Sequence, residues 1–172
     1  MSAVKVLFVC TGNTCRSPSA EALARAAGLD GVEFASAGTH AVDGESINPD
    51  LAAALPRDLD TSGFRSRRLT PALLADADLV VTMEVAHRSF VLDERPELRR
   101  TVFTLGQLAT AVGSLPEGLD RAARLAHLGD ARGHADPALD VPDPYRRGTE
   151  AASGCVARLE ELLRAVLPVL DR

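Results

Sequence analysis

Lysine, cysteine and long apolar runs are all scarce in this 172-residue sequence. Lys5 is the only lysine among 19 basic residues, a bias that we attribute to coding and not to function. The formal charge is -5 and no long basic stripe is present, which argues against a nucleic-acid or anionic-membrane partner. No apolar run approaches the roughly 18 residues of a membrane-spanning helix.

The three cysteines are an odd number, and Cys10 and Cys15 stand close together near the N-terminus. No charged, apolar and small-residue signal segment precedes them. We therefore expect free thiols in a reducing cytoplasm and not a disulfide framework. The length suits one domain, 1–172, that buries a core without staples, and no repeat or linker divides it. The pattern says nothing about oligomeric state.

Short apolar, β-branched segments alternate with helical patterns along the chain. Strands are predicted at residues 4–9, 32–37, 78–83 and 101–104, and the first reads as a strand buried on both faces. Helices are predicted at residues 17–27, 48–55, 71–75, 84–92 and 149–170, with a marginal helix and loops at 115–141. The alternation predicts a three-layer α/β fold, with a four-stranded parallel sheet flanked by helices and ligands at the carboxyl ends of the strands.

A loop with the sequence CTGNTCR, residues 10–16, joins the first predicted strand to the first predicted helix. Ser17 is the expected N-cap of that helix, and Pro18 its first residue. Gly12 and Asn13 suit positions where the backbone turns tightly or is left-handed. Because unpaired N–H groups of such a loop and of a helix N-terminus converge on one anion, we predict a phosphate-binding loop after strand 1.

Two side chains of this loop carry the predicted chemistry. Arg16 can chelate two phosphate oxygens with its planar guanidinium. The same positive field favours a thiolate at Cys10, which is a nucleophile aimed at phosphorus, and Ser17 is placed to donate its hydroxyl to the sulfur. Cysteine and arginine at this spacing are weak evidence alone, but the strand before them and the helix after them disfavour an ordinary surface loop.

Residues 6–18, VLFVCTGNTCRSP, resemble the signature of the low-molecular-weight protein tyrosine phosphatase family. Residues 35–38, 77–79, 103–105 and 143–145 are also similar to that family, so the resemblance covers nearly the whole chain. It implies a protein phosphatase that hydrolyses phosphotyrosine through a cysteinyl-phosphate, with a phosphorylated protein as partner and with no metal or cofactor. The implied phosphate-binding residues are Thr11, Gly12, Asn13, Thr14, Cys15, Arg16 and Ser17.

Cleavage of a phosphate ester needs a second residue that protonates the leaving group. Asp143 is the candidate, because flanking prolines stiffen the segment 141–145 around one carboxylate. An Asp-Pro pair alone is more often a turn. The resemblance implies that Asp143 is the general acid that later activates water, and Asp136 and Asp140 rank below it.

The other two cysteines have different expected roles. Cys15 can form a reversible disulfide with Cys10 that protects the nucleophile from over-oxidation, and the family uses its second cysteine in this way. The alternative is that Cys15 only packs behind the loop. Cys155 falls in the closing helix and is expected in the core.

Two positions depart from the family pattern. Thr14 stands where tyrosine-specific members usually carry a bulky aliphatic residue, and the branch that hydrolyses phosphoarginine has threonine there, so phosphoarginine is the alternative substrate. Ser36 matches the serine that supports the loop asparagine. Phe64 replaces a histidine of the same network, so we expect the support of Asn13 to be rebuilt or weaker.

Tyr145 is the only tyrosine and the predicted pocket wall, with Thr14 at the floor and His40 opposite, in the segment 39–47. The four histidines lack metal-ligand spacing and are expected on surfaces or helix faces: His40, His87, His127 and His134. An arsenate reductase is a first rival, but Cys155 would be its only further thiol. A non-catalytic phosphate-binding module is the second rival, and the intact set of Cys10, Arg16 and Asp143 argues against it.

Overall fold

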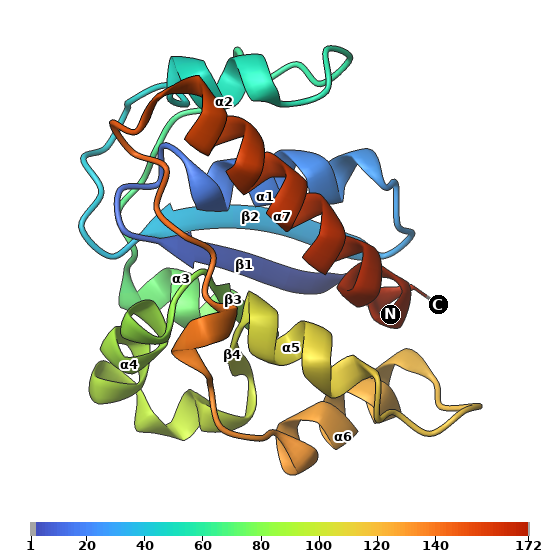
Figure 1. Ribbon diagram of the computed structural model, residues 1–172. Helices are drawn as coiled ribbons and strands as arrows, with labels where there is room; N and C mark the ends of the chain where they lie inside the picture. The colour runs from blue at the N-terminus through green and yellow to red at the C-terminus, as the bar shows by residue number, and fades with distance from the viewer. Residues whose placement is uncertain (1–2, 172) are drawn as a thin grey trace.

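The structure is a computed structural model that describes residues 3–171, and it contains a four-stranded, all-parallel sheet (Figure 1). Its strand order is β2-β1-β3-β4. The strands are β1 (Val4–Cys10), β2 (Val32–Gly38), β3 (Leu79–Thr82) and β4 (Val102–Thr104). The predicted α/β class, with four parallel strands and a loop after the first, is confirmed.

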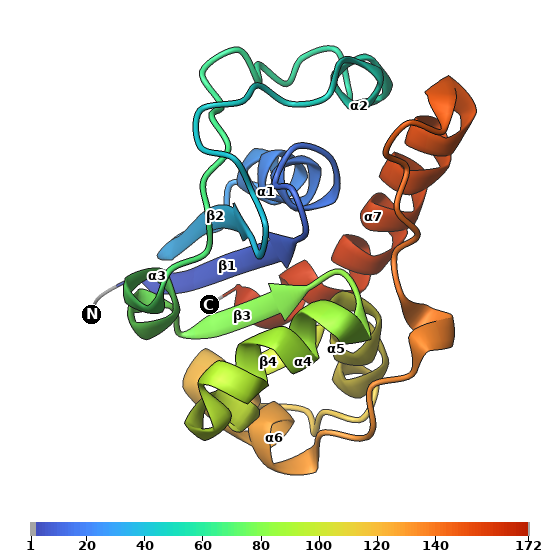
Figure 2. The ribbon, with the colours of Figure 1, turned by 90° about the vertical axis from the view of Figure 1, so that its left-hand side faces the viewer.

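Helices flank the sheet on both faces (Figures 1 and 2). Side chains of α1, α5 and α7 share one apolar core with the sheet, and those of α3 and α4 share the other. The α-helices are α1 (Arg16–Ala26), α2 (Pro49–Ala54), α3 (Pro71–Asp76), α4 (Val85–Glu94), α5 (Leu105–Val112), α6 (Arg121–Ala131) and α7 (Gly148–Leu170). No helix within residues 3–171 has the length and apolarity that crossing a membrane requires.

Strand β1 shows why its sequence is almost continuously apolar. Val6 and Phe8 point into the core shared with α1, α5 and α7, whereas Leu7 and Val9 point into the core shared with α3 and α4. Each such buried side chain stabilises the fold by about 1.5–3 kcal/mol. Strand β1 is therefore held between two layers of helices, and Cys10 lies at its carboxyl end.

Helix α7 buries the face that its apolar spacing predicts. Its buried face runs from Ala152 to Leu170, and Cys155 lies on it, so the expectation that Cys155 belongs to the core is confirmed. The weakly periodic segment 115–141 contains α6, whose first turn is capped because Asp120 accepts a hydrogen bond from the N–H of Ala123 at 2.8 Å.

Two local predictions are corrected. Helix α1 begins at Arg16, with Cys15 as N-cap and no side-chain cap, so the assignment of Ser17 as N-cap is wrong. The helix α5 directly after β4 was not predicted. Its signal is the reciprocal capping of Thr104 and Gln107, in which each side chain bonds the other residue's backbone N–H.

Candidate active site

The phosphate-binding loop, residues 10–17, connects β1 to α1 at the carboxyl edge of the sheet. Asn13 has a φ of 53°, so the predicted left-handed conformation is confirmed there. Gly12 does not take that conformation. Asparagine tolerates the left-handed region better than most residues, so one side chain both shapes the loop and, as described below, anchors it.

The carbonyl groups of the loop are bonded from outside it. Backbone N–H groups in the segment 39–48 donate to the carbonyl oxygens of Cys10, Thr11 and Thr14 at 2.8–2.9 Å. None of the backbone N–H groups of residues 11–17 donates to an acceptor in the described part of the chain. These N–H groups are therefore available to converge on an anion.

Gly38, at the end of β2, lets the backbone of β2 lie close to the backbone of the phosphate-binding loop. A Cβ atom at this position would lie 2.5 Å from the carbonyl oxygen of Thr11 and 2.8 Å from the backbone nitrogen of Asn13. Any side chain here would displace the loop, so the small residue is required by space.

Buried hydrogen bonds hold the nucleophile side of the loop. The sulfur of Cys10 lies 3.0 Å from Oγ of Ser17. Nδ2 of Asn13 donates to Oγ of Ser17 and to Oγ of Ser36, each at 2.9 Å, which confirms the predicted contact between Ser36 and Asn13. The backbone N–H of Arg67 donates to Oδ1 of Asn13 at 2.9 Å. The support of the asparagine is thus built partly from a backbone group.

The guanidinium of Arg16 is buried, and its Nη1 end is held by two hydrogen bonds. Nη1 donates to the carboxylate of Glu84 and, at 2.9 Å, to the carbonyl oxygen of Val141. Burial opposes the charge, but the bond to Glu84 and the neighbouring Cys10 and Asp143 outweigh it and raise the pKa of Arg16. Nε is buried and has no hydrogen-bond partner among residues 3–171, so the Nε–Nη2 edge can chelate two oxygens of a phosphate.

The predicted catalytic and wall residues meet at one cavity of about 230 Å³. Asp143 reaches it from the loop before α7, where Oδ2 lies 3.7 Å from Nη2 of Arg16 and Oδ1 accepts the N–H of Tyr145 at 3.1 Å. The lining residues are Cys10, Thr11, Gly12, Thr14, Cys15, Arg16, His40, Val42, Glu45, Asp143 and Tyr145. The side chains of Asn13 and Ser17 do not line it; they are buried in the hydrogen-bond network instead.

The two wall residues, Tyr145 and His40, each contact a neighbouring side chain. The guanidinium carbon of Arg146 lies 5.1 Å from the ring centroid of Tyr145. The ring of His40 packs edge-on against Phe90 with centroids 5.5 Å apart. Both predicted wall residues therefore line the cavity, and they come from different loops.

Two residues of the site were not predicted, Glu84 and His87, although His87 does lie in a helix, α4. His87 is buried, not on the surface: its Nδ1 accepts the N–H of Glu84 at 3.1 Å, which leaves Nε2 to donate to Oγ1 of Thr11 at 2.8 Å. Burial, and then the nearby Arg16, lower the pKa of His87 to about 4. Both residues follow the carboxyl end of β3, and that position was the signal that could have found them.

The competing aspartates have structural partners. Asp140 accepts the N–H of Val85 at 3.0 Å, and burial raises its pKa. Asp136 caps the N–H of Ala138 at 2.9 Å. Neither lines the cavity of Cys10 and Arg16.

Both remaining thiols are free and buried. Burial raises the pKa of Cys15 to about 11 and that of Cys155 to about 12, so both are protonated at neutral pH. The disulfide between Cys10 and Cys15 stays a prediction.

Comparison with known proteins agrees with this geometry. A protein-arginine-phosphatase of Geobacillus stearothermophilus is 36% identical over 160 residues, 93% of this chain and 96% of the relative. The protein-tyrosine-phosphatase Wzb of Salmonella typhi is 30% identical over 161 residues, 93% of this chain and 89% of the relative.

Solved structures extend the likeness to three dimensions. The YwlE arginine phosphatase from Geobacillus stearothermophilus superposes with a TM-score of 0.76 at 29% identity, over 96% of this chain and 91% of that one. The family model described as low molecular weight phosphotyrosine protein phosphatase matches residues 5–119. The chain therefore belongs to this family of cysteine-dependent phosphohydrolases.

Proposed function

We propose that this protein is a protein phosphatase that hydrolyses phosphotyrosine through a cysteinyl-phosphate. One observation carries the proposal: Cys10, Arg16 and Asp143 line one cavity together with the loop, whose N–H groups at residues 11–17 have no acceptor among the described residues. A phosphorylated protein is the implied partner. We further infer a reducing compartment such as the cytoplasm, because Cys10 must be a free thiol to act.

The first step transfers the phosphoryl group to sulfur. The loop N–H groups and Arg16 hold the phosphate oxygens, and the thiolate of Cys10 attacks phosphorus from the floor of the cavity. The bond from phosphorus to the tyrosine oxygen breaks. Asp143, at the mouth, gives its proton to that oxygen, so the product leaves as a neutral phenol.

The second step regenerates the enzyme. Asp143, now a carboxylate, takes a proton from a water molecule whose oxygen attacks phosphorus. The sulfur–phosphorus bond breaks, and the electron pair returns to Cys10 as thiolate while inorganic phosphate leaves. Glu84 and the carbonyl of Val141 hold Arg16 in place during both steps.

The mechanism is tested with a phosphotyrosine peptide and the substitution Cys10→Ser. We expect turnover to fall by at least about 10⁴-fold, because the nucleophile is lost. Cys155→Ser is the matched control, since it removes a buried thiol outside the cavity. A Cys10→Ser protein that keeps wild-type turnover would contradict the mechanism.

Phosphoarginine is a second candidate substrate, favoured by Thr14 in the cavity lining and by the similarity to arginine phosphatases. A small polar side chain there widens and polarises the floor. Wild type and Thr14→Ile are compared on phosphotyrosine and phosphoarginine peptides. If Thr14 sets specificity, the substitution shifts preference toward phosphotyrosine, and an unchanged ratio removes this argument.

A further inference from the structure

A chain of hydrogen bonds leads from the sulfur of Cys10 to a carboxylate on α1. Ser17 lies 3.0 Å from the sulfur, and Asn13 bonds both Ser17 and Ser36 at 2.9 Å. Oγ of Ser36 then donates to Oε2 of Glu21 at 2.6 Å. All members except Glu21 are buried, and the side chain of Glu21 is only 12% exposed.

The direction of the bonds among Asn13, Ser36 and Glu21 is fixed. The backbone N–H of Arg67 donates to Oδ1 of Asn13, so Nδ2 is the donor to both serines. Ser36 receives that N–H and must send its own proton elsewhere. A carboxylate only accepts, so the hydroxyl of Ser36 donates its hydrogen bond to Glu21. Ser17 likewise receives an N–H, and its own hydroxyl has two acceptors in reach, the sulfur of Cys10 at 3.0 Å and the carbonyl oxygen of Ala37 at 3.4 Å. The shorter distance and the charge of a thiolate favour the sulfur.

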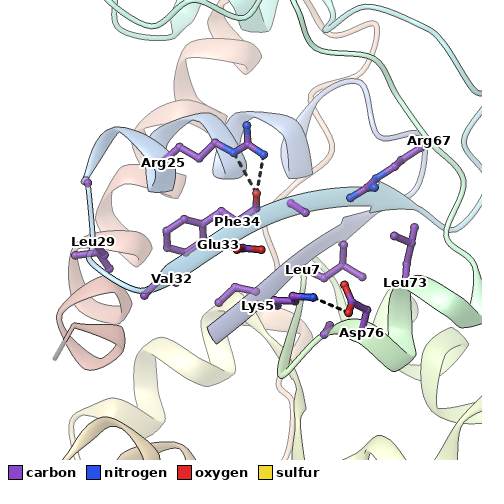
Figure 3. Close-up of a pocket in the computed structure, with 14 residues that line it drawn as sticks. Lys5, Leu7, Arg25, Leu29, Val32, Glu33, Phe34, Arg67, Leu73 and Asp76 are labelled. Carbon is purple, nitrogen blue, oxygen red and sulfur yellow. Dashed lines mark hydrogen bonds and ion pairs between the residues drawn. The ribbon is translucent and has the colours of Figure 1, made fainter. Parts of the chain in front are cut away.

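Arg25 contacts Glu21 at the outer end of this series of hydrogen bonds. Its Nη2 lies 2.8 Å from Oε1 of Glu21, one helical turn away. The same guanidinium donates through Nε and Nη2 to the carbonyl oxygen of Phe34, at 3.1 and 2.8 Å, and Figure 3 shows it reaching from α1 to this oxygen on β2. Arg25 thus fixes the carboxylate to the sheet that carries Ser36.

A cavity of about 620 Å³ lies at this outer end, lined by Glu21, Arg25 and Ser36. Phe64 forms part of its wall, and a phenyl ring offers Ser36 no acceptor. In the described part of the chain, Glu21 is the acceptor that the structure provides for the hydroxyl of Ser36.

We propose that Glu21 is a positioning residue of the reaction. It sets the direction of the hydrogen bonds that end on the sulfur of Cys10, acting through Ser36, Asn13 and Ser17. Without the carboxylate, Ser36 has no obligatory acceptor, the amide of Asn13 loses one fixed partner, and the hydroxyl of Ser17 is directed less firmly at the thiolate. This inference rests on the proposed phosphatase function.

The test is Glu21→Gln, which keeps the size of the side chain but adds a donor that competes in the chain. The primary readout is the pH dependence of Cys10 alkylation by iodoacetamide, followed by mass on the peptide that contains Cys10. Below the midpoint of that profile, we expect the rate to fall about tenfold, the scale of one lost hydrogen bond to a charged group. With a phosphotyrosine peptide, kcat should fall more than KM rises.

Two further variants make the test sharp. Ser36→Ala should move the alkylation profile in the same direction, and its combination with Glu21→Gln should be far less than additive, because both cut one chain. Glu33→Gln, which neutralises an exposed carboxylate on β2 outside the chain, is the control and should leave the profile unchanged.

A Glu21→Gln protein with the wild-type alkylation profile would overturn the inference, even if its thermal stability fell. The alkylation assay needs no substrate. If the wild type proved not to hydrolyse phosphotyrosine, the proposed function would fail while the role of Glu21 was still measured.

Discussion

The phosphate-binding loop and the mouth of its cavity differ sharply in how they are held. In the loop, Asn13 and Ser17 are 0% exposed and Arg16 is 2% exposed. At the mouth, Tyr145 is 50% exposed and Val42 is 64% exposed. The loop takes its hydrogen bonds from β2, from the segments after β2 and β3, and from the chain before α7. At the mouth, Tyr145 and His40 are held by ring contacts, with Arg146 and Phe90 respectively.

This difference separates chemistry from recognition. The buried side chains of Asn13 and Ser17 are tolerated in the loop because they are hydrogen-bonded, whereas Nε of Arg16 and the loop N–H groups are left for the phosphate. The mouth has little packing to lose, so its residues can vary with the substrate. We therefore expect substitutions of the buried loop residues to destroy turnover, and those of mouth residues that transfer no proton to change selectivity.

The largest effect is expected for Arg16→Lys. An ammonium cannot chelate two oxygens or keep the bonds to Glu84 and Val141, so kcat/KM should fall by about 10⁴-fold. The measurement is turnover of p-nitrophenyl phosphate, with thermal unfolding as a check on folding. Arg147→Lys, at an exposed position, is the control, and a loss below tenfold would contradict the role of Arg16.

Asp143→Asn probes a mouth residue with a chemical role, and so sharpens the comparison. The amide cannot protonate the leaving oxygen, so kcat on a phosphotyrosine peptide should fall by roughly 10²- to 10³-fold. The loss should be smaller for p-nitrophenyl phosphate, whose leaving group needs less protonation. Asp136→Asn is the control, and equal losses on both substrates would speak against general acid catalysis.

Gly38→Ala tests whether the loop geometry depends on close backbone contact. The new Cβ would press on the carbonyl of Thr11, so we expect about 1–3 kcal/mol loss of unfolding free energy and at least about tenfold lower kcat. Denaturant unfolding and turnover measure the two effects. Gly63→Ala, which meets no atom within 4 Å, is the control, and indistinguishable behaviour of the two variants would refute the contact.

Tyr145→Ala should have a smaller effect, confined to recognition. Loss of one aromatic contact changes KM for a phosphotyrosine peptide by about 2- to 10-fold, with kcat nearly kept. Steady-state kinetics on the peptide and on a non-aromatic phosphate ester separate the two. A collapse of kcat on both substrates would place Tyr145 with the loop instead of the mouth.

The last prediction concerns stability and not turnover, through the pH dependence of unfolding at His87. Its pKa of about 4 in the folded state lies below the ordinary value of 6.5, so the unfolded chain binds the extra proton first. The stability that this neutral histidine contributes is complete above about pH 6.5 and declines as the pH falls toward 4. Denaturant unfolding of His87→Gln over this range should show a shallower decline, and parallel curves would contradict it.

Sequence alone determined the elements that are contiguous along the chain. The apolar run of β1 and the loop from Cys10 to Arg16 are neighbours in sequence, so local rules for strands and loops were sufficient to place them, although the N-cap of α1 was predicted two residues too late. The spacing of apolar residues likewise predicted α7 and the burial of Cys155.

Only the tertiary structure decided which distant groups complete the site. Arg16 and Val141 are separated by 125 positions, and the contacts of Glu84 and His87 with the loop arise because β3 lies beside β1 in the sheet. No local pattern encodes such pairings, since strand order fixes them. That order also explains one detail that the sequence left open: His87, predicted on a surface or helix face, lies in α4 and is buried against Thr11 of the loop.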